Sequence, residues 1–196
     1  MSIDLSKLNP DTRYLNDMRS VLRDQEWAKS ASNMALYFMY RGIEELNQIR
    51  YDITVVPANM LGQEYVKTKG HYHIGKYGEV YTVLEGQAIY LMQKKFNDDN
   101  IADVYAVQAK KGDVVVIPSD YGHITINPSK EELKMANWVA SDCKSDYSLF
   151  EKLQGACYHY TLEGWQKNEN YKNVPPLRFE EPLKEVPSNL DFLKVK

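Results

Sequence analysis

Three histidines and one glutamate are the residues of this sequence best suited to bind a metal ion. His71 and His73 are separated by one residue, so on a β-strand both imidazoles project from the same face. Glu79 follows at the start of the next strand-like run, and His123 opens a later one. Imidazole nitrogens with a carboxylate oxygen suit a divalent transition metal. We therefore expect one such ion per chain, Fe²⁺ in use with Mn²⁺, Zn²⁺ or Ni²⁺ as alternatives, bound by His71, His73, Glu79 and His123.

The alternative is that each histidine is an ordinary core or surface residue. Against it, a glycine precedes the histidine pair, a glutamate follows it, and the third histidine opens a separate strand-like run. The fourth histidine, His159, lies in the segment CYHYTLEG, where no second histidine stands at strand spacing. We expect His159 to be structural or exposed.

Many short strands must position these side chains. Short runs rich in Val, Ile, Tyr and Thr follow one another, separated by glycines, Pro118 and a polar stretch at 97–100. The runs are 34–40, 50–56, 63–68, 79–84, 87–92, 101–107, 113–117, 123–126 and 133–140. Such spacing without intervening helices predicts an all-β sandwich or barrel, with a hairpin over 87–107. Residues 10–31 carry apolar side chains at helical spacing and predict a short or irregular N-terminal helix.

One domain accounts for the whole chain, 1–196. Its predicted core spans about 34–145, preceded by an N-terminal decoration over 1–33 and followed by a C-terminal extension over 146–196. Four of the eight prolines fall in the final stretch, which predicts an extended tail over the surface or along a neighbouring subunit. Exposed edge strands are usually covered or paired, so we expect a homodimer.

Composition excludes several classes of protein. A formal net charge of −3 argues against nucleic acid as the partner. No run approaches the roughly 18 apolar residues of a membrane span, and the first ten residues lack the apolar middle of a signal peptide. Two cysteines are too few for a disulfide framework and fit a reducing compartment. We therefore expect a cytoplasmic protein without nucleic acid or membrane as a partner.

Two segments resemble the paired motifs of the cupin family. GHYHIGKYGEVYTVLEG at 70–86 is similar to the first motif, and GDVVVIPSDYGHITIN at 112–127 to the second. From about residue 13 to about 179 the chain resembles, more narrowly, the cupin-type glucose-6-phosphate isomerases known mainly from archaea and some bacteria. RYLNDM, LYFMY, TKGHYH, EVY and the Asp-Tyr pair at 146–147 carry that resemblance. It implies a cupin fold, a double-stranded β-helix or jelly-roll barrel.

Three positions depart from the pattern of these isomerases or of cupins generally. Five residues separate His73 from Glu79, where these isomerases typically have six. Asp120 stands where many cupins have glycine, and Ser145 where the isomerases have a histidine.

The resemblance implies a metal-dependent interconversion of glucose 6-phosphate and fructose 6-phosphate, a step of glycolysis and gluconeogenesis. That reaction needs a base near C2, for which Glu79 is the candidate. Tyr81, two residues later, points to the same face and is expected to bond substrate oxygens. A proton transfer through an enediolate and a metal-assisted hydride shift both remain open.

The phosphate group requires hydroxyl, amide and cationic partners. Thr68, Lys69 and the backbone amide of Gly70 precede the metal ligands, and Thr54 matches a family position on a neighbouring strand. Their alternative roles are ordinary strand and solvated positions. Two further substrate-binding residues, Tyr37 and Tyr147, are implied by the resemblance only, with core packing as the alternative.

Two other functions compete with the isomerase. Three histidines and a glutamate also suit an iron-dependent oxygenase, although the Thr-Lys-Gly approach to the histidine pair favours an anionic sugar. A non-catalytic sugar- or metal-binding cupin is the other alternative, and Tyr81 beside a full ligand set argues against it.

Overall fold

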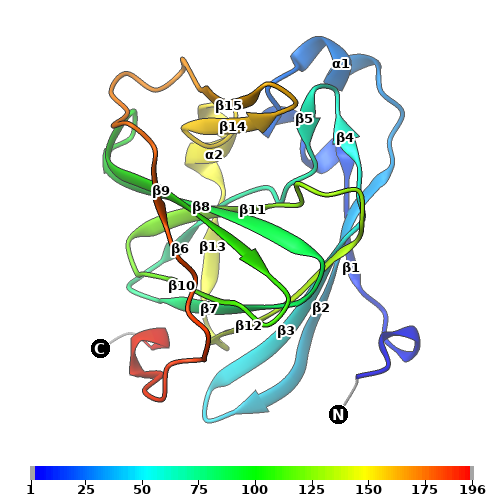
Figure 1. The fold of residues 1–196 in the computed structure, drawn as a ribbon, viewed down its shortest axis with the longest axis vertical. Coiled ribbons are helices and arrows are strands. Elements are labelled where there is room, and N and C mark those ends of the chain that lie inside the picture. The colour runs from blue at the N-terminus through cyan, green and yellow to red at the C-terminus, as the bar shows by residue number, and fades with distance from the viewer. Residues whose placement is uncertain (1–2, 195–196) are drawn as a thin grey trace.

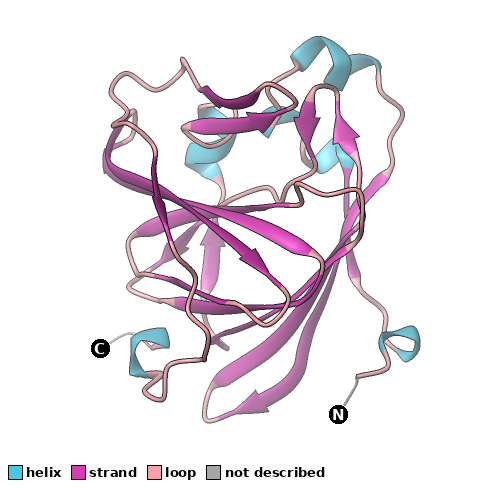
Figure 2. Cartoon of the chain, viewed as in Figure 1, coloured by secondary structure: helices cyan, strands magenta, loops and turns pink. Residues whose placement is uncertain are grey.

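The computed structural model describes residues 3–194, so residues 1–2 of the predicted N-terminal decoration and 195–196 of the C-terminal extension lie outside it. Strands make up most of the regular structure, and the helices are single short turns (Figure 2). The helical elements are η1 (Leu5–Lys7), η2 (Leu15–Asp17), η3 (Arg19–Val21), α1 (Gln25–Ser30), α2 (Ser148–Lys152) and η4 (Asp191–Leu193). Over 3–194, none of these helices has the length and apolar character that crossing a bilayer requires.

The largest sheet has six strands and carries Tyr37, Thr54, Glu79 and Tyr81 of the candidate site. In spatial order its strands are β1 (Asp11–Tyr14), β2 (Ala35–Leu46), β3 (Ile49–Val56), β12 (Leu133–Ala140), β7 (Glu79–Glu85) and β10 (Val114–Ile117). Alternation sets its two faces. On β12, for example, Met135, Asn137 and Val139 line an inner pocket, whereas Ala136 and Trp138 belong to apolar clusters on the opposite face.

A second sheet faces the first one across the core (Figure 1). Its strands, in order, are β11 (Tyr121–Ile126), β8 (Gln87–Asn97), β9 (Asn100–Lys110) and β16 (Arg178–Glu180). From β7 to β12 the chain passes back and forth between the two sheets, with β8 and β9 forming a hairpin within the second one, and this is the path of a double-sheet jelly roll. Fully buried side chains such as Tyr90, Met92, Val104 and Ile124 fill the space between them. The predicted all-β, cupin-type fold is confirmed.

Two small sheets complete the molecule. β13 (Lys144–Asp146) pairs with β6 (Tyr72–Ile74) beside the main sheets. The other small sheet lies over one end of the fold, with strands in the order β15 (Gly164–Lys167), β14 (Tyr158–Thr161), β5 (Glu64–Tyr65) and β4 (Met60–Leu61) (Figure 1).

The N-terminal segment differs from the predicted helix. Residues 11–14 form β1, because they pair with the free edge of β2 with Thr12 opposite Phe38, and only short helical turns follow. Tertiary pairing overrides the local helical pattern here. Leu15, Met18, Val21 and Leu22 are nevertheless fully buried in the core.

The C-terminal tail packs against its own chain. β16 runs parallel to β9, Leu183 bridges to Val114, and η4 reaches the start of β7 (Figure 1). There the Gly78 N–H donates to the Phe192 carbonyl at 3.0 Å. Leu193 is fully buried in a cluster with Val80. The tail therefore covers this chain's own sheet.

Candidate metal centre

Backbone pairing places two of the histidines opposite each other. The N–H of His123 donates to the His71 carbonyl at 3.0 Å, and the N–H of His71 donates back at 3.3 Å. Gly70 makes this approach possible. At its φ of +82°, a Cβ would also lie 2.4 Å from Cγ2 of Ile124, so only glycine fits without strain.

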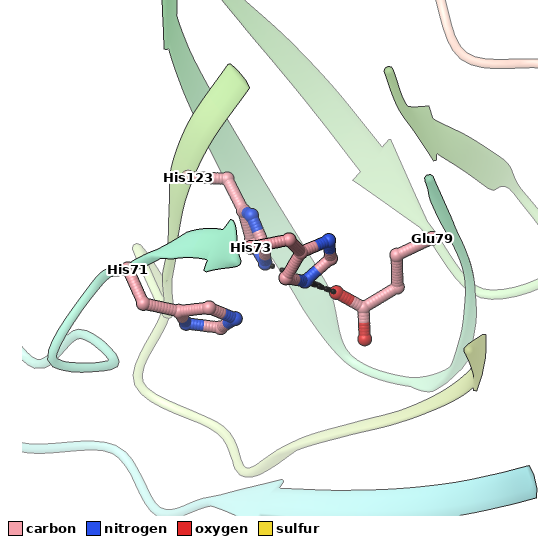
Figure 3. Close-up of side chains that lie close together, drawn as sticks. All are labelled: His71, His73, Glu79 and His123. Carbon is pink, nitrogen blue, oxygen red and sulfur yellow. Dashed lines mark ion pairs between the residues drawn. The ribbon is translucent and has the colours of Figure 1, made fainter. Parts of the chain in front are cut away.

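Four side chains converge from three segments of the fold (Figure 3). His71 and His73 come from the β6 segment, Glu79 from the first position of β7, and His123 from β11. One potential ligand atom from each lies within 4.8 Å of all the others. Oε2 of Glu79 is 3.3 Å from Nε2 of His73 and 3.2 Å from Nε2 of His123.

A backbone contact orients the His73 ring. Its Nδ1 lies 2.9 Å from the Tyr77 carbonyl, which can only accept a hydrogen bond, so Nδ1 carries the proton. In the neutral ring, Nε2 then holds the lone pair and faces the cluster. This is the usual arrangement of a metal-ligating histidine, with one nitrogen on a carbonyl and the other free for the ion.

Burial and mutual charge shift the pKa values in this cluster. Burial, together with the neighbouring His123 and His73, holds the pKa of His71 well below its ordinary value. Burial also lowers the pKa of His123. Burial opposes ionisation of Glu79, but its contacts with His123 and His73 outweigh it and keep the carboxyl pKa well below the usual range. For His73, burial opposes charging, yet Cys143 and Glu79 raise the pKa to about 10, so a metal ion bound at Nε2 would displace a proton from that nitrogen.

The donor set fits a divalent transition metal. Three imidazoles and one carboxylate supply nitrogen and oxygen ligands, the combination typical of Fe, Mn, Zn and Ni. Oε2 of Glu79 and Nδ1 of His123 are buried without a hydrogen-bond partner among residues 3–194. Buried polar atoms are normally paired, so an unpaired carboxylate oxygen facing imidazole nitrogens is an arrangement that a bound cation would satisfy.

Tyr81 extends the cluster on the same face of β7. Its hydroxyl lies 3.5 Å from Nε2 of His123, and its ring packs against Tyr90 with centroids 5.1 Å apart. Burial and the charge of Glu79 hold the pKa of Tyr81 well above its ordinary value, so the hydroxyl keeps its proton. It can therefore donate a hydrogen bond to a ligand oxygen.

One pocket collects every residue that the sequence analysis singled out for metal or substrate. Its lining includes Tyr37, Thr54, Thr68, Lys69, Gly70, His71, His73, Glu79, Tyr81, His123 and Tyr147. These residues come from segments more than a hundred positions apart, which the two facing sheets and the segments around β6 and β13 bring together. The pocket therefore combines a candidate metal-ligand cluster with polar groups.

The polar groups occupy the part of the pocket around Lys69. The Tyr37 hydroxyl accepts the Lys69 N–H at 3.2 Å, and Thr68 is tied to β11 through its hydroxyl, which accepts the Thr125 N–H at 2.9 Å. Nζ of Lys69 lies 2.6 Å from Oε1 of Glu151 and 5.3 Å from the centre of the Tyr147 ring. Lys69 is thus already paired rather than simply solvated.

The departures from the cupin pattern have local structural explanations. Asp120 has φ +73°, the left-handed conformation for which glycine is the usual choice. The short connection after His73 contains Gly75 at φ +102° and still brings His73 to Glu79. Ser145 lies opposite His73 on β13 and lines the pocket.

Sequence reasoning missed several residues of the same pocket. Arg41, Arg50, Asp52, Asn137 and Cys143 also line it. Asp52 is buried and accepts from Nε of Arg50 at 2.9 Å and from the Gly42 N–H at 2.7 Å. A signal for Asn137 existed: in LKMANWVA it shares the alternation of Leu133, Met135 and Val139, so it is a polar residue on an otherwise apolar face.

Comparison with protein families gives one match over most of the chain. A family model described as glucose-6-phosphate isomerase matches residues 12–176. The glucose-6-phosphate isomerase of Thermococcus litoralis is 28% identical over 142 residues, covering 69% of this chain and 72% of the relative. That of Thermococcus gammatolerans is 27% identical over 146 residues, covering 71% and 75%. The resemblance found in the sequence is confirmed.

Solved structures overlap with parts of the fold. A predicted oxalate decarboxylase from Thermotoga maritima is 18% identical with a TM-score of 0.44, covering 70% of this chain and 96% of that one. An oxalate oxidase in complex with the substrate analogue glycolate is 13% identical, also with a TM-score of 0.44, covering 57% and 54%. Neither overlap reaches a similarity at which functions can be compared.

Proposed function

This chain belongs to the glucose-6-phosphate isomerase family, and from that membership we propose that it is a metal-dependent isomerase interconverting glucose 6-phosphate and fructose 6-phosphate. One observation carries the proposal. A single pocket holds a His₃Glu cluster, a buried tyrosine donor and a group of hydroxyl, amide and ammonium donors. A phosphorylated sugar needs all three: a site for the reacting carbons, a donor for their oxygens and a grip on the phosphate.

His71, His73, Glu79 and His123 would hold the metal, and the ion would act there as a Lewis acid on the substrate oxygens. Glu79 is the base. It removes the proton from C2 of the open-chain aldose and returns it to C1, while a hydroxyl proton passes from O2 to O1. Its low pKa keeps the carboxylate ionised, the form that a general base requires.

Tyr81 assists with the oxygens. Its hydroxyl keeps its proton and lies beside His123, so it can donate to O1 or O2 as negative charge develops there. Its position two residues after Glu79 on β7 places base and donor on the same face.

Thr54, Thr68, Gly70 and Lys69 form the phosphate grip in this proposal, with Tyr37 and Tyr147 beside it. The two hydroxyls and the Gly70 amide supply neutral donors, and Lys69 supplies a positive charge. Because Lys69 is paired with Glu151, the phosphate must compete with that carboxylate. We therefore assign more of the affinity to the hydroxyls and the amide.

The same proposal includes the finer points of the assignment. The metal in use is Fe²⁺, with Mn²⁺, Zn²⁺ or Ni²⁺ as alternatives, and the enzyme serves glycolysis and gluconeogenesis in the cytoplasm. The chain folds as one domain around a core at about 34–145.

It acts as a homodimer, supported by the outer edge of β1, which pairs with no other strand among residues 3–194. Light scattering that gives one 22.7 kDa species at micromolar concentration would rule the dimer out.

A coupled assay tests the activity. Conversion of fructose 6-phosphate is followed for the purified protein, for the protein after chelator treatment, and for His123→Ala. We expect activity that the chelator abolishes and Fe²⁺ or Mn²⁺ restores, and metal content that falls in the variant. Activity unaffected by the chelator would reject metal dependence. No conversion by the metal-loaded protein would reject the isomerase, and oxygen consumption would then point to an oxygenase.

A further inference from the structure

The side chain of Asn137 makes one short contact inside the pocket. Its Nδ2 donates to Oε1 of Glu79 at 2.6 Å, and both residues are at least 95% buried. An ionised carboxylate can only accept hydrogen bonds. The amino group of the carboxamide must therefore face Glu79, and its carbonyl oxygen must face elsewhere. Chemistry alone fixes the orientation of this amide.

This hydrogen bond makes the two carboxylate oxygens of Glu79 unequal. Oε1 is satisfied by Asn137, whereas Oε2 has no hydrogen-bond partner among residues 3–194 and lies nearest to His73 and His123. In Figure 3 one oxygen is directed at the two imidazoles and the other turns away from them. The terminal torsion of a glutamate is otherwise broad, so a fixed donor on one oxygen selects which oxygen meets the cluster.

Asn137 is itself held on a rigid element. It lies in the middle of β12, with Asp52 on β3 opposite it on one side and Tyr81 on β7 opposite it on the other. A central strand paired on both edges moves less than a loop, so it can support a site precisely placed relative to the sheet.

A buried asparagine often serves only to satisfy nearby backbone groups. Asn127 does this: its Nδ2 donates to the carbonyls of Val56 and Glu131. Asn137 differs because its described hydrogen bond goes to a side chain of the metal cluster rather than to backbone. Losing the Asn137 donor would leave Glu79 with two unpaired oxygens in a buried site.

We propose that Asn137 is a positioning residue for Glu79, which directs Oε2 into the metal cluster by holding Oε1. The inference rests on the proposed function for its effect on turnover, but its effect on metal binding does not depend on that function. Partners of this kind typically change metal affinity or activity 10- to 100-fold when they are removed.

The test uses Asn137→Leu, which keeps the approximate shape and removes the donor, with Lys134→Leu on the opposite face of β12, outside the pocket, as the control. The dissociation constant for Mn²⁺ is measured by electron paramagnetic resonance of the free ion, and kcat and KM are measured at saturating Mn²⁺. We expect Asn137→Leu to raise the Mn²⁺ dissociation constant about tenfold and to lower kcat about 10- to 100-fold. KM is expected to stay within about threefold of the control, because the phosphate grip is untouched.

A dissociation constant and a kcat both within twofold of the control would overturn the proposal, whereas a change in either supports it. If Asn137→Leu fails to fold, Asn137→Asp makes the same comparison, because it keeps the shape but replaces the donor with an acceptor. If the wild-type protein shows no isomerase activity, the proposed function fails, and Mn²⁺ affinity alone then decides the role of Asn137.

Discussion

Two buried glutamates in this molecule sit among basic side chains and have opposite characters. Around Glu64, Oε1 meets Lys67 and His159, and Oε2 accepts the Arg23 N–H at 3.2 Å. Glu64, Lys67 and His159 are each at least 97% buried, and none of them lines the pocket. Glu79 also meets two histidines, but its Oε2 has no hydrogen-bond partner among residues 3–194, and the pocket reaches it.

The difference shows how to separate a structural charge cluster from a functional one. At Glu64 every carboxylate oxygen has a donor and a lysine balances the charge, so the cluster is complete without a ligand. It ties β5 to β14 and to the N-terminal segment through Arg23. At Glu79 one oxygen has no hydrogen-bond partner among residues 3–194, and only the imidazoles of His73 and His123 face it. The residue type is the same in both places. What distinguishes Glu79 is the carboxylate oxygen that has no hydrogen-bond partner among residues 3–194.

The largest expected effect is on turnover, from Glu79→Gln. The amide keeps the shape and an acceptor oxygen but cannot accept a proton, so turnover is expected to fall about 10²- to 10⁴-fold. Three histidines remain, as in His₃ catalytic zinc sites, so much of the metal is expected to stay bound. Metal content and kcat are measured together, with Glu85→Gln at the exposed end of β7 as the control. Near-normal turnover in the metal-loaded variant would remove Glu79 from the role of base.

The Glu64 cluster predicts a loss of stability instead. Lys67→Met leaves a buried carboxylate without its charge partner and is expected to cost about 3–5 kcal/mol. Metal bound per folded chain should not change. Lys29→Met breaks a Lys–Glu pair of the same three-residue spacing on the exposed surface, where less than about 1 kcal/mol is expected.

Urea denaturation measures both variants. The double variant Glu64→Leu with Lys67→Met is expected to recover much of the loss, because a well-packed apolar pair replaces a buried ion pair at little cost. A Lys67→Met variant as stable as Lys29→Met would contradict this description of the cluster.

The pH dependence of stability sharpens the same contrast. Burial opposes ionisation of Glu64, but Lys67 and His159 outweigh it and lower its pKa to about 2. A depressed pKa in the folded state stabilises the protein above the unfolded pKa, and that contribution disappears as the pH falls towards 2. Its size is on the order of 3 kcal/mol.

Urea midpoints of the wild type and of Glu64→Gln, compared at several pH values from 6 to 2.5, check this expectation. The difference between the two proteins should be largest above about pH 5 and should shrink as the pH falls. A difference that stays constant across the range would show that Glu64 does not ionise as described.

The smallest effect is expected at Lys69, whose partner Glu151 is partly exposed. Lys69→Gln is expected to raise KM for the sugar phosphate about threefold to tenfold and to leave kcat nearly unchanged. Stability should change by less than about 1 kcal/mol. Steady-state kinetics measure KM for the sugar phosphate in Lys69→Gln and in Glu151→Gln. If Glu151 competes with the phosphate, Glu151→Gln lowers KM; an unchanged KM in both variants would exclude Lys69 from the grip.

The sequence was most informative where spacing and strand alternation coincide. His71 and His73 share a face because the side-chain period of a strand is two, and Glu79 and Tyr81 follow the same rule on β7. The nine predicted runs all contain or overlap a strand, because their alternation and their glycine and proline breaks are local signals.

Contacts between distant segments could not be predicted in the same way. Lys67 lies in the strand-like run 63–68, but its burial depends on Glu64 and on His159, which lies 92 positions away. β1 was predicted as helix because its pairing with β2 is not visible in local propensity. Asn137 was visible as a polar residue on an apolar face, but only the packed sheets show that its donor reaches Glu79.

The contact between Gly78 and Phe192 also bears on the order in which the site is assembled during protein synthesis. Protein synthesis runs from the N-terminus, so all four proposed metal ligands are made long before η4. The Phe192 carbonyl in η4 accepts the N–H of Gly78, the residue that precedes Glu79. A Cβ on Gly78 would lie 2.6 Å from the Phe192 ring, so the two segments close directly on each other. During its synthesis the chain therefore passes through a period in which all four proposed ligands exist but the segment that packs against Gly78, the residue before Glu79, has not yet been made.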